Sequence, residues 1–193
     1  VMAGYSYADI ADCGFSLNCC TKGNVVVAKN YLNFLESILE SKINFAYPKE
    51  NTLDEVIEKI KNLTNSEKPI LLIEPADNIG GGTPGDATDL LSSFLKSDHD
   101  GILAIINDPE AAKICHLSIV GEEIELTIGA KFDNFHGVPI TLKARIENLS
   151  DGKFKLKNKK SHLASMMGIN INMGLSAVLK NEKLTLLLTT IKT

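Results

Sequence analysis

Apolar residues recur every three or four positions in two stretches near the start of the chain, a spacing that predicts amphipathic helices. The first stretch begins after Gly23-Asn24 and continues to residue 43. The second follows Thr52 and continues to residue 63, and it opens with a Thr and a Glu in the spacing of a capping box. We therefore expect one helix in each stretch.

Between residues 69 and 118, short continuous apolar runs alternate with helical spacing. The runs at 70–73 and 101–106 are typical of strands buried on both faces. The segment between them has helical spacing, and Asp108-Pro109 is a helix start, with Asp as the N-cap. The order strand, helix, strand, helix predicts a βαβα unit with parallel strands joined by a right-handed crossover.

After Gly121 the apolar positions alternate with polar ones, which indicates antiparallel strands with one wet face. We therefore predict an α+β fold, with an α/β-like first half that contains the βαβα unit and an antiparallel β second half. Its layers would form a two-layer or three-layer sandwich of mixed sheet and helices. No linker separates the halves, so we expect residues 1–193 to be one domain. The chain starts at Val1 and ends in an apolar run, which favours a fragment of a longer protein.

Composition narrows the function classes. The chain has 193 residues, of which 44% are hydrophobic and 23% charged, so a globular core is expected. The net charge of −4 disfavours a nucleic-acid partner, although lysines 153–160 leave a polyanion-binding patch as the alternative to a solvated strand face. No apolar run approaches the roughly 20 residues of a membrane span, and no secretory signal is visible. We expect a cytoplasmic protein without a membrane partner, whose four cysteines are free thiols.

The segment Asp77-Asn-Ile-Gly-Gly-Gly-Thr-Pro-Gly-Asp86, the glycine-rich loop, carries the most functional information. It follows a predicted buried strand and precedes a predicted helix, which is where open α/β sheets bind ligands. Three glycines without side chains allow backbone N–H groups to converge on an anion or a carbonyl oxygen. Thr83 is placed to cap the helix, with Pro84 at its first position. The candidate substrate-binding residues are Asp77, Asn78, Gly80, Gly81, Gly82, Thr83, Gly85 and Asp86.

Other interpretations of this loop stay open. It could be a tight turn before a well-capped helix with nothing bound. Gly80 to Gly85 also fit the letters of the dinucleotide fingerprint G-x-G-x-x-G, although a proline lies inside it. No lysine follows the glycines, which excludes a P-loop. The acids Asp77 and Asp86 could orient polar groups or fix the loop itself.

The sequence supports neither a metal site nor a nucleophilic triad in this chain. The four histidines are scattered, and neither H-E-x-x-H nor G-x-S-x-G is present. His136 lies in a turn between strands, where a surface turn is the main interpretation and a substrate-contact loop is the alternative. We therefore assign no metal ligands, cofactor or catalytic residues within this chain.

The glycine-rich loop together with Thr88 resembles the signature of the C-terminal domain of the microcystinase C (MlrC) family. Residues 4–14 resemble the segment where that domain begins, and residues 108–112 resemble the helix start after its second strand. Later matches are individually short: Gly121, residues 129–131, residues 137–139 and Gly174. One departure is Ile79, where the family commonly has proline.

The resemblance implies the C-terminal part of a zinc-dependent peptidase or amidohydrolase. Family members are metallopeptidase-like hydrolases, and the name-giving one degrades linear products of a cyclic peptide toxin. Their zinc ligands lie in a larger N-terminal domain, so zinc is expected in that domain and no cofactor here. The expected partners are this N-terminal domain, with the loop at the shared cleft, and a peptide-like or small amide substrate. The chain alone would be inactive, and a homodimer through exposed apolar surface is possible. The alternative is a non-catalytic module that binds a small anion or another protein.

Overall fold

The computed structural model describes residues 11, 14–45, 50–61, 63 and 68–192, and it divides into two compact units, residues 1–52 and 53–193. In the first unit, helix α1 spans Val25–Lys42 and a 3-10 turn follows at Ile43–Phe45. The Asn24 side chain caps α1 by accepting a hydrogen bond from the Val27 amide at 3.0 Å. The predicted first helix is thus confirmed, and none of its residues is buried.

The second unit, which we call unit 2, contains the sheet. Its elements are, in order, α2 (Leu53–Lys61), a 3-10 turn η2 (Ile79–Gly81), α3 (Asp89–Lys96), β1 (Ile102–Asn107), α4 (Pro109–Cys115), β2 (Glu123–Ile128), β3 (Ile140–Ser150), β4 (Lys153–Lys155), α5 (His162–Met167), β5 (Asn170–Asn172), β6 (Ser176–Lys180) and β7 (Leu184–Thr189). Among the described residues no helix is long and apolar enough to cross a membrane.

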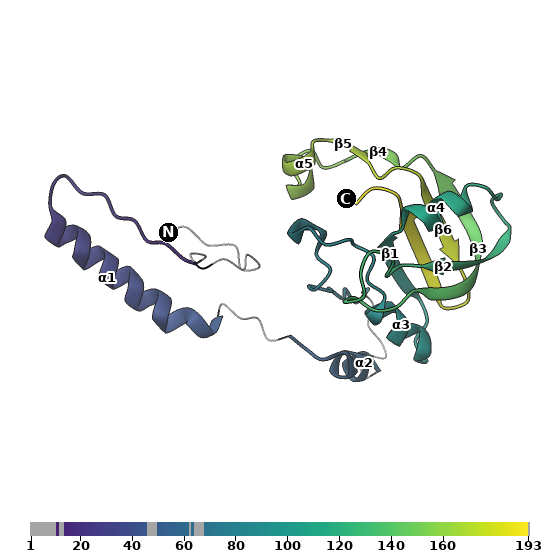
Figure 1. Ribbon diagram of the computed structural model, residues 1–193, viewed down its shortest axis with the longest axis horizontal. Helices are drawn as coiled ribbons and strands as arrows, with labels where there is room; N and C mark the ends of the chain where they lie inside the picture. Colours follow the sequence, from purple (N-terminus) through teal and green to yellow (C-terminus); the bar gives the residue numbers. More distant parts are fainter. Residues whose placement is uncertain (1–10, 12–13, 46–49, 62, 64–67, 193) are drawn as a thin grey trace. The chain divides into compact units, whose positions relative to one another are not determined.

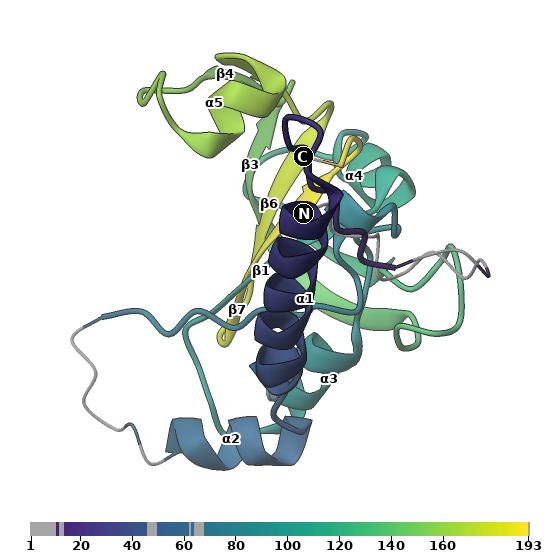
Figure 2. The same cartoon turned by 90° about the vertical axis from the view of Figure 1, so that its left-hand side faces the viewer.

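Five strands form one mixed sheet in the order β1-β7-β6-β3-β2. Strand β1 pairs with β7 in parallel, and the other neighbours are antiparallel. Figures 1 and 2 show β6 and β7, drawn in yellow, inside this sheet. A separate two-stranded sheet joins β4 and β5 beside α5. The α+β class and the antiparallel second half are confirmed.

The core lies on one face of the five-stranded sheet. Helix α4 contacts β2, β6 and β7, and its residues Ala111, Ala112 and Cys115 are fully buried. Leu91 of α3 joins the same cluster as the inward residues of the strands. On the opposite face of β1, Leu103 and Ile105 are exposed. Unit 2 therefore has two layers, with helices on one face of a sheet.

Two local predictions are wrong. Residues 70–73 form no strand among the described residues, and the parallel partner of β1 is instead β7, from the far end of the chain. This part of the expected βαβα unit is therefore missing. Helix α3 begins at Asp89 rather than at Thr83 and Pro84. The cause is visible at the loop: the Asp77 carboxylate accepts hydrogen bonds from two amides that a helix starting at Pro84 would include.

Candidate functional site

The glycine-rich loop lies beside the carboxyl end of β1, not at the end of the strand that the sequence predicts at residues 70–73. The Asn107 amide at the end of β1 donates to the Gly85 carbonyl at 2.8 Å. From the C-terminal segment, Lys192 Nζ donates to the Thr83 carbonyl at 2.8 Å. This is the edge of an α/β sheet where loops bind ligands. The structure thus places the eight candidate residues together at one edge of unit 2.

Asp77 fixes the two halves of the loop to each other. Its Oδ1 accepts from the Gly85 amide at 2.8 Å, and its Oδ2 accepts from the Ala87 amide at 2.7 Å. Both carboxylate oxygens are therefore occupied by the chain itself. Of the two roles left open by the sequence, Asp77 performs the structural one.

The amides of the three consecutive glycines are also used inside the loop. Gly80 donates to Asn78 Oδ1 at 3.0 Å, and Gly81 donates to the Asn78 carbonyl at 2.7 Å. Gly82 donates to the Ile79 carbonyl at 3.0 Å and closes the 3-10 turn with φ +98°. In this conformation the glycines have no amide left to stabilise an oxyanion. What they present to solvent is a bare backbone surface, since all three residues are exposed.

Asp86 anchors the loop to the turn that follows β2. The residue is 1% exposed, and its Oδ2 accepts from the amides of Lys131 at 2.8 Å and Phe132 at 3.3 Å. Its backbone carbonyl accepts from the Ala130 amide at 2.7 Å. The other carboxylate oxygen, Oδ1, and the hydroxyl of Thr83 are buried without a partner among the described residues. A buried oxygen without a partner is uncommon and leaves one acceptor available inside the loop.

The turn at residues 132–138 clamps the loop from the other side. The Thr88 amide donates to the His136 carbonyl at 2.9 Å, and the Thr88 hydroxyl donates to the Val138 carbonyl at 2.7 Å. His136 Nδ1 lies 2.9 Å from Asp133 Oδ1, and its Nε2 lies 3.1 Å from the Ala76 carbonyl. The hydrogen bond to Asp133 raises the pKa of His136, because it favours the imidazolium. His136 thus joins this turn to the entrance of the loop, and the substrate contact predicted as the alternative stays a prediction.

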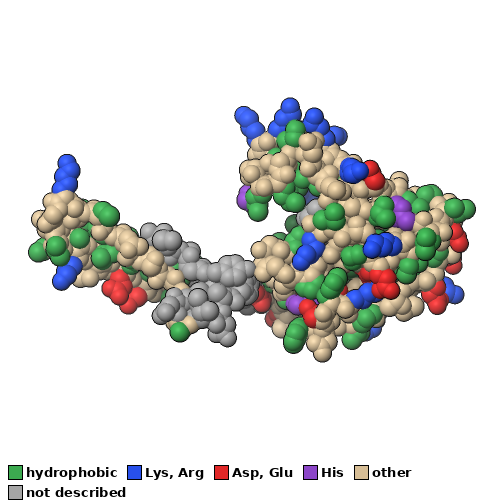
Figure 3. All heavy atoms as spheres, turned by 45° about the horizontal axis from the view of Figure 1, so that its top comes forward, with side chains coloured by type: hydrophobic (Ala, Val, Ile, Leu, Met, Phe, Trp, Pro, Cys, Tyr) green, Lys and Arg blue, Asp and Glu red, His purple; other side chains and the backbone are tan. Residues whose placement is uncertain are grey.

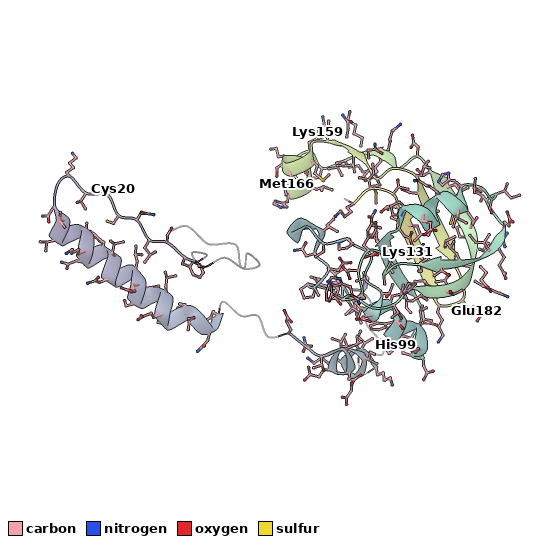
Figure 4. The ribbon with its side chains drawn as sticks, viewed as in Figure 1. Cys20, His99, Lys131, Lys159, Met166 and Glu182 are labelled. Carbon is pink, nitrogen blue, oxygen red and sulfur yellow. The ribbon has the colours of Figure 1, made fainter. Side chains whose placement is uncertain are left out.

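A buried carboxylate beside the loop organises the start of α4. Asp108 caps the helix through the Ala111 amide at 3.0 Å and accepts from the Gly129 amide at 2.9 Å. The side chain of Lys131 is labelled in Figure 4, and its Nζ lies 3.1 Å from Asp108 and 2.9 Å from Glu110. Partial burial lowers the pKa of Lys131, but these two carboxylates outweigh burial and raise it overall.

An open cavity of about 580 Å³ lies next to this ion-pair network. It is lined by Asp108, Pro109, Glu110, Lys113, Ile114, Leu117, Lys131 and Phe132. Phe132 belongs to both the cavity wall and the turn that holds Asp86. The loop and this cavity therefore share one supporting turn.

The part of the chain that the structure describes contains no group of three His, Cys, Asp or Glu residues that could hold a metal ion. Both carboxylate oxygens of Asp77 in the loop, and of Asp108 beside it, already accept hydrogen bonds within the chain, from amides or from a lysine. The described residues thus show no cluster of zinc ligands, and the location of zinc in an N-terminal domain stays a prediction.

Lysine side chains gather over the small lobe formed by β4, α5 and β5 (Figure 3). The lysines at 153, 155, 157, 159 and 160 are all exposed. Among the described residues, Lys153 has an acidic neighbour, with its Nζ 3.5 Å from Asp151 Oδ2. A solvated strand face describes Lys153 and Lys155, whereas the other three lysines lie outside β4.

Sequence reasoning missed the residues that support the loop from a distance. Thr88 was assigned only to the family signature, and Asp108 only to a helix cap. Lys131 bonds to Asp86, which is 45 positions away in the sequence. His136 bonds to Ala76, which is 60 positions away. The available signals were the glycines at 129 and 137: a Cβ on Gly129 would lie 2.8 Å from the Asp86 carbonyl, and one on Gly137 would lie 2.9 Å from the Asp89 amide.

Comparison with known proteins shows which family this chain belongs to. The family described as MlrC C-terminus matches residues 72–193. Microcystinase C from Sphingomonas sp. is 29% identical over 84 residues, which is 43% of this chain and 17% of that protein. A crystal structure from Mesorhizobium sp. BNC1, of a protein named "Putative metallopeptidase", aligns with a TM-score of 0.69 and 19% identity over 86% of this chain and 32% of that one. The chain thus spans a third or less of these relatives, and the structural likeness shows the fold.

Proposed function

The chain belongs to the MlrC C-terminus family, and we propose that it forms the C-terminal part of a zinc-dependent peptidase or amidohydrolase. The family match includes the whole glycine-rich loop and all its supporting turns. The names of the relatives, a microcystinase and a metallopeptidase, support a hydrolase that acts on peptide-like or small amide substrates. The zinc and its ligands would lie in the N-terminal domain of the longer protein, and this chain alone would be inactive.

In this proposal the glycine-rich loop forms one wall of a cleft shared with that domain. The observation that carries it is the exposed backbone surface without side chains at Gly80 to Gly82. The loop is held by Asp77, Asp86 and the turn at 132–138, and a Cβ on Gly82 would meet nothing within 4 Å. An extended substrate backbone can approach such a surface closely because no side chain intervenes. The loop would position substrate by shape, since its glycine amides are already bonded.

The small-anion alternative is weaker after this finding. Anion sites in glycine-rich loops depend on free N–H groups that converge on the ligand. Here the amides at 80, 81 and 82 all donate within the loop. We therefore treat a non-catalytic module as one possible outcome of the experiment below and not as a second proposal.

The experiment compares the longer protein with this chain on short peptides and N-acyl amino acids, with and without a chelator. Two variants of the longer protein follow, Gly82→Leu and the control Gly23→Leu. Both glycines have positive φ, +98° and +76°, and neither has an atom within 4 Å of the added Cβ. Both variants thus place a side chain at a positive φ, and only Gly82 lies in the loop.

We expect chelator-sensitive turnover by the longer protein only. Gly82→Leu should lower kcat/KM at least about tenfold, which corresponds to about 1.4 kcal/mol, while Gly23→Leu leaves it unchanged. Equal effects of both variants would refute the role of the loop. No turnover by a zinc-loaded longer protein on any substrate would favour the non-catalytic module.

A further inference from the structure

Helix α1 has a broad apolar face that stays largely exposed in the described structure. Its apolar residues occur as neighbouring pairs at positions 27–28, 31–32, 34–35 and 38–39. The residues between these pairs are all polar. At about 100° per residue, the pairs lie on one side of the helix, across about 160° of its circumference. On this face Tyr31 is 59% exposed and Phe34 is 61% exposed.

The helices of unit 2 differ from α1 in this respect. Helix α3 has eight residues and buries Leu91 and Phe94, and α4 buries three of its seven residues. Helix α1 has 18 residues and buries none. A helix of this length is only marginally stable in water by itself, because most helical stability in proteins comes from packing of an apolar face. The three valines at its start, residues 25–27, lower its helix propensity further. The helix therefore requires a partner.

The width of the face indicates the kind of partner. In a two-stranded coiled coil the apolar residues form a narrow seam, at two positions in every seven. A helix that packs on a globular core has a wider apolar stripe. The face of α1 is of the wider kind, and it includes the two aromatic side chains of Tyr31 and Phe34. It therefore fits the core of a globular domain better than one helix of a second copy of the chain.

The comparisons indicate where such a domain lies. The match to the MlrC C-terminus family begins at residue 72, after both α1 and α2. The structural match to the Mesorhizobium protein covers 86% of this chain, which is more than residues 72–193 can supply. The likeness in fold therefore includes part of the chain before residue 72. The same match takes up only 32% of the Mesorhizobium protein, which leaves ample chain in that relative for a further domain.

We propose that α1 is a helix of the N-terminal domain of the longer protein, with its apolar face packed in the core of that domain. Lys29, Glu36 and Glu40 on the opposite face stay in water. The boundary between the two domains falls between α1 and α2, since α2 contacts α3 within unit 2. Residues 1–193 thus contain parts of two domains. The inference rests on the longer protein of the proposed function, but not on its activity or its zinc.

Hydrogen exchange measured by mass spectrometry on the longer protein and on this chain tests the proposal. The reporter is the peptide that contains α1, and the reference is a peptide from β6 and β7 of unit 2. Two variants of the longer protein follow. Leu35→Asp places a carboxylate at the middle of the apolar face, and the control Asn33→Asp places one at the middle of the polar face. The measurement needs no turnover, so its failure is distinguishable from failure of the proposed hydrolase.

We expect the amides of α1 to exchange at least about tenfold more slowly in the longer protein than in this chain, with the reference peptide equal in both. Leu35→Asp should remove this difference and Asn33→Asp should retain it. If Leu35→Asp does not fold, the comparison of the two unsubstituted proteins decides by itself.

Three results would overturn the proposal. The first is equal exchange of α1 in the longer protein and in this chain. The second is an equal effect of the two variants. The third is exchange of α1 in this chain that slows as the protein concentration rises, because a second copy of the chain would then cover the face.

Discussion

Replacing Asp77 by alanine should destabilise unit 2, because this side chain closes the glycine-rich loop. The carboxylate accepts two amide hydrogen bonds, from Gly85 at 2.8 Å and from Ala87 at 2.7 Å. A hydrogen bond to a charged group contributes about 1.5–3 kcal/mol, but Asp77 is only half-buried and water replaces part of it. We therefore expect Asp77→Ala to lower the free energy of unfolding by about 2–3 kcal/mol. Asp77→Asn keeps one acceptor oxygen and should lose about half of that.

The assay is urea unfolding monitored by NMR signals of amides in β6 and β7. Intrinsic fluorescence would report on the wrong part of the chain, because there is no tryptophan and all four tyrosines precede residue 50. A shift of the urea midpoint without a change in slope would indicate a change in stability alone. Amides of the central strands report global unfolding of unit 2 rather than local opening of the loop.

Asp151→Ala is the matched control. Its carboxylate also accepts a backbone hydrogen bond, from Lys153 at 3.1 Å, but the side chain is exposed and joins residues only two apart. We expect a change within about 0.5 kcal/mol. If Asp77→Ala were as mild as this control, the two short bonds would not hold the loop, and the structural role assigned to Asp77 would be refuted.

Titration, backbone strain and thiol burial give measurable outcomes elsewhere in unit 2. The pKa of His136 is raised mainly by its hydrogen bond to Asp133, so this pair stabilises the fold below about pH 6.5 and progressively less as the pH rises through the raised pKa. Urea unfolding at pH 6 and pH 8 should show this loss of stability. The same loss in His136→Gln would contradict the assignment to His136. In thermal unfolding, Gly129→Ala should destabilise unit 2 by at least about 1 kcal/mol more than Gly82→Ala does. Both glycines have positive φ, but only at Gly129 would the added Cβ meet a backbone oxygen, at 2.8 Å. Equal losses of stability would exclude that clash. Burial raises the pKa of Cys115 to about 11, so N-ethylmaleimide at pH 8 should label it only in urea, and rapid labelling of the folded chain would show an accessible thiolate.

The hydrophobic pattern predicts those parts of the fold that depend on local periodicity. Helix α1, the cap and proline at the start of α4, and the alternation of β2 and β3 all follow from spacing within one element. The parallel pairing of β1 with β7 joins residues about 80 positions apart, and nothing in either strand specifies that partner. The prediction for residues 70–73 fails as well, because the run has the apolar character of a buried strand but is coil in the structure, with Ile70, Leu71 and Ile73 exposed.

At the candidate site, the sequence identifies the glycine-rich loop but does not predict which contacts its residues make. Two acids around three glycines predict ligand contacts, and the glycine amides predict a site for an anion or a carbonyl oxygen. The structure shows that Asp77 bonds to residues eight and ten positions away, and that Asp86 bonds to residues 45 and 46 positions away. These separations along the sequence exceed the range of turn and cap motifs. Local sequence patterns therefore could not predict these hydrogen bonds.

These contacts change how activity data on the loop must be interpreted. A carboxylate that binds substrate and one that holds the loop both lower turnover when replaced by alanine, because misplacing a substrate-positioning surface by even about 1 Å slows a reaction strongly. Asp86 separates the two cases, since its Oδ2 supports the turn at Lys131 while its Oδ1 has no partner among the described residues. Asparagine at this position can keep the supporting oxygen and change only the unpartnered one. A loss of turnover in Asp86→Asn at unchanged stability would therefore assign a ligand contact to that oxygen, whereas a loss confined to alanine would assign the residue to the scaffold.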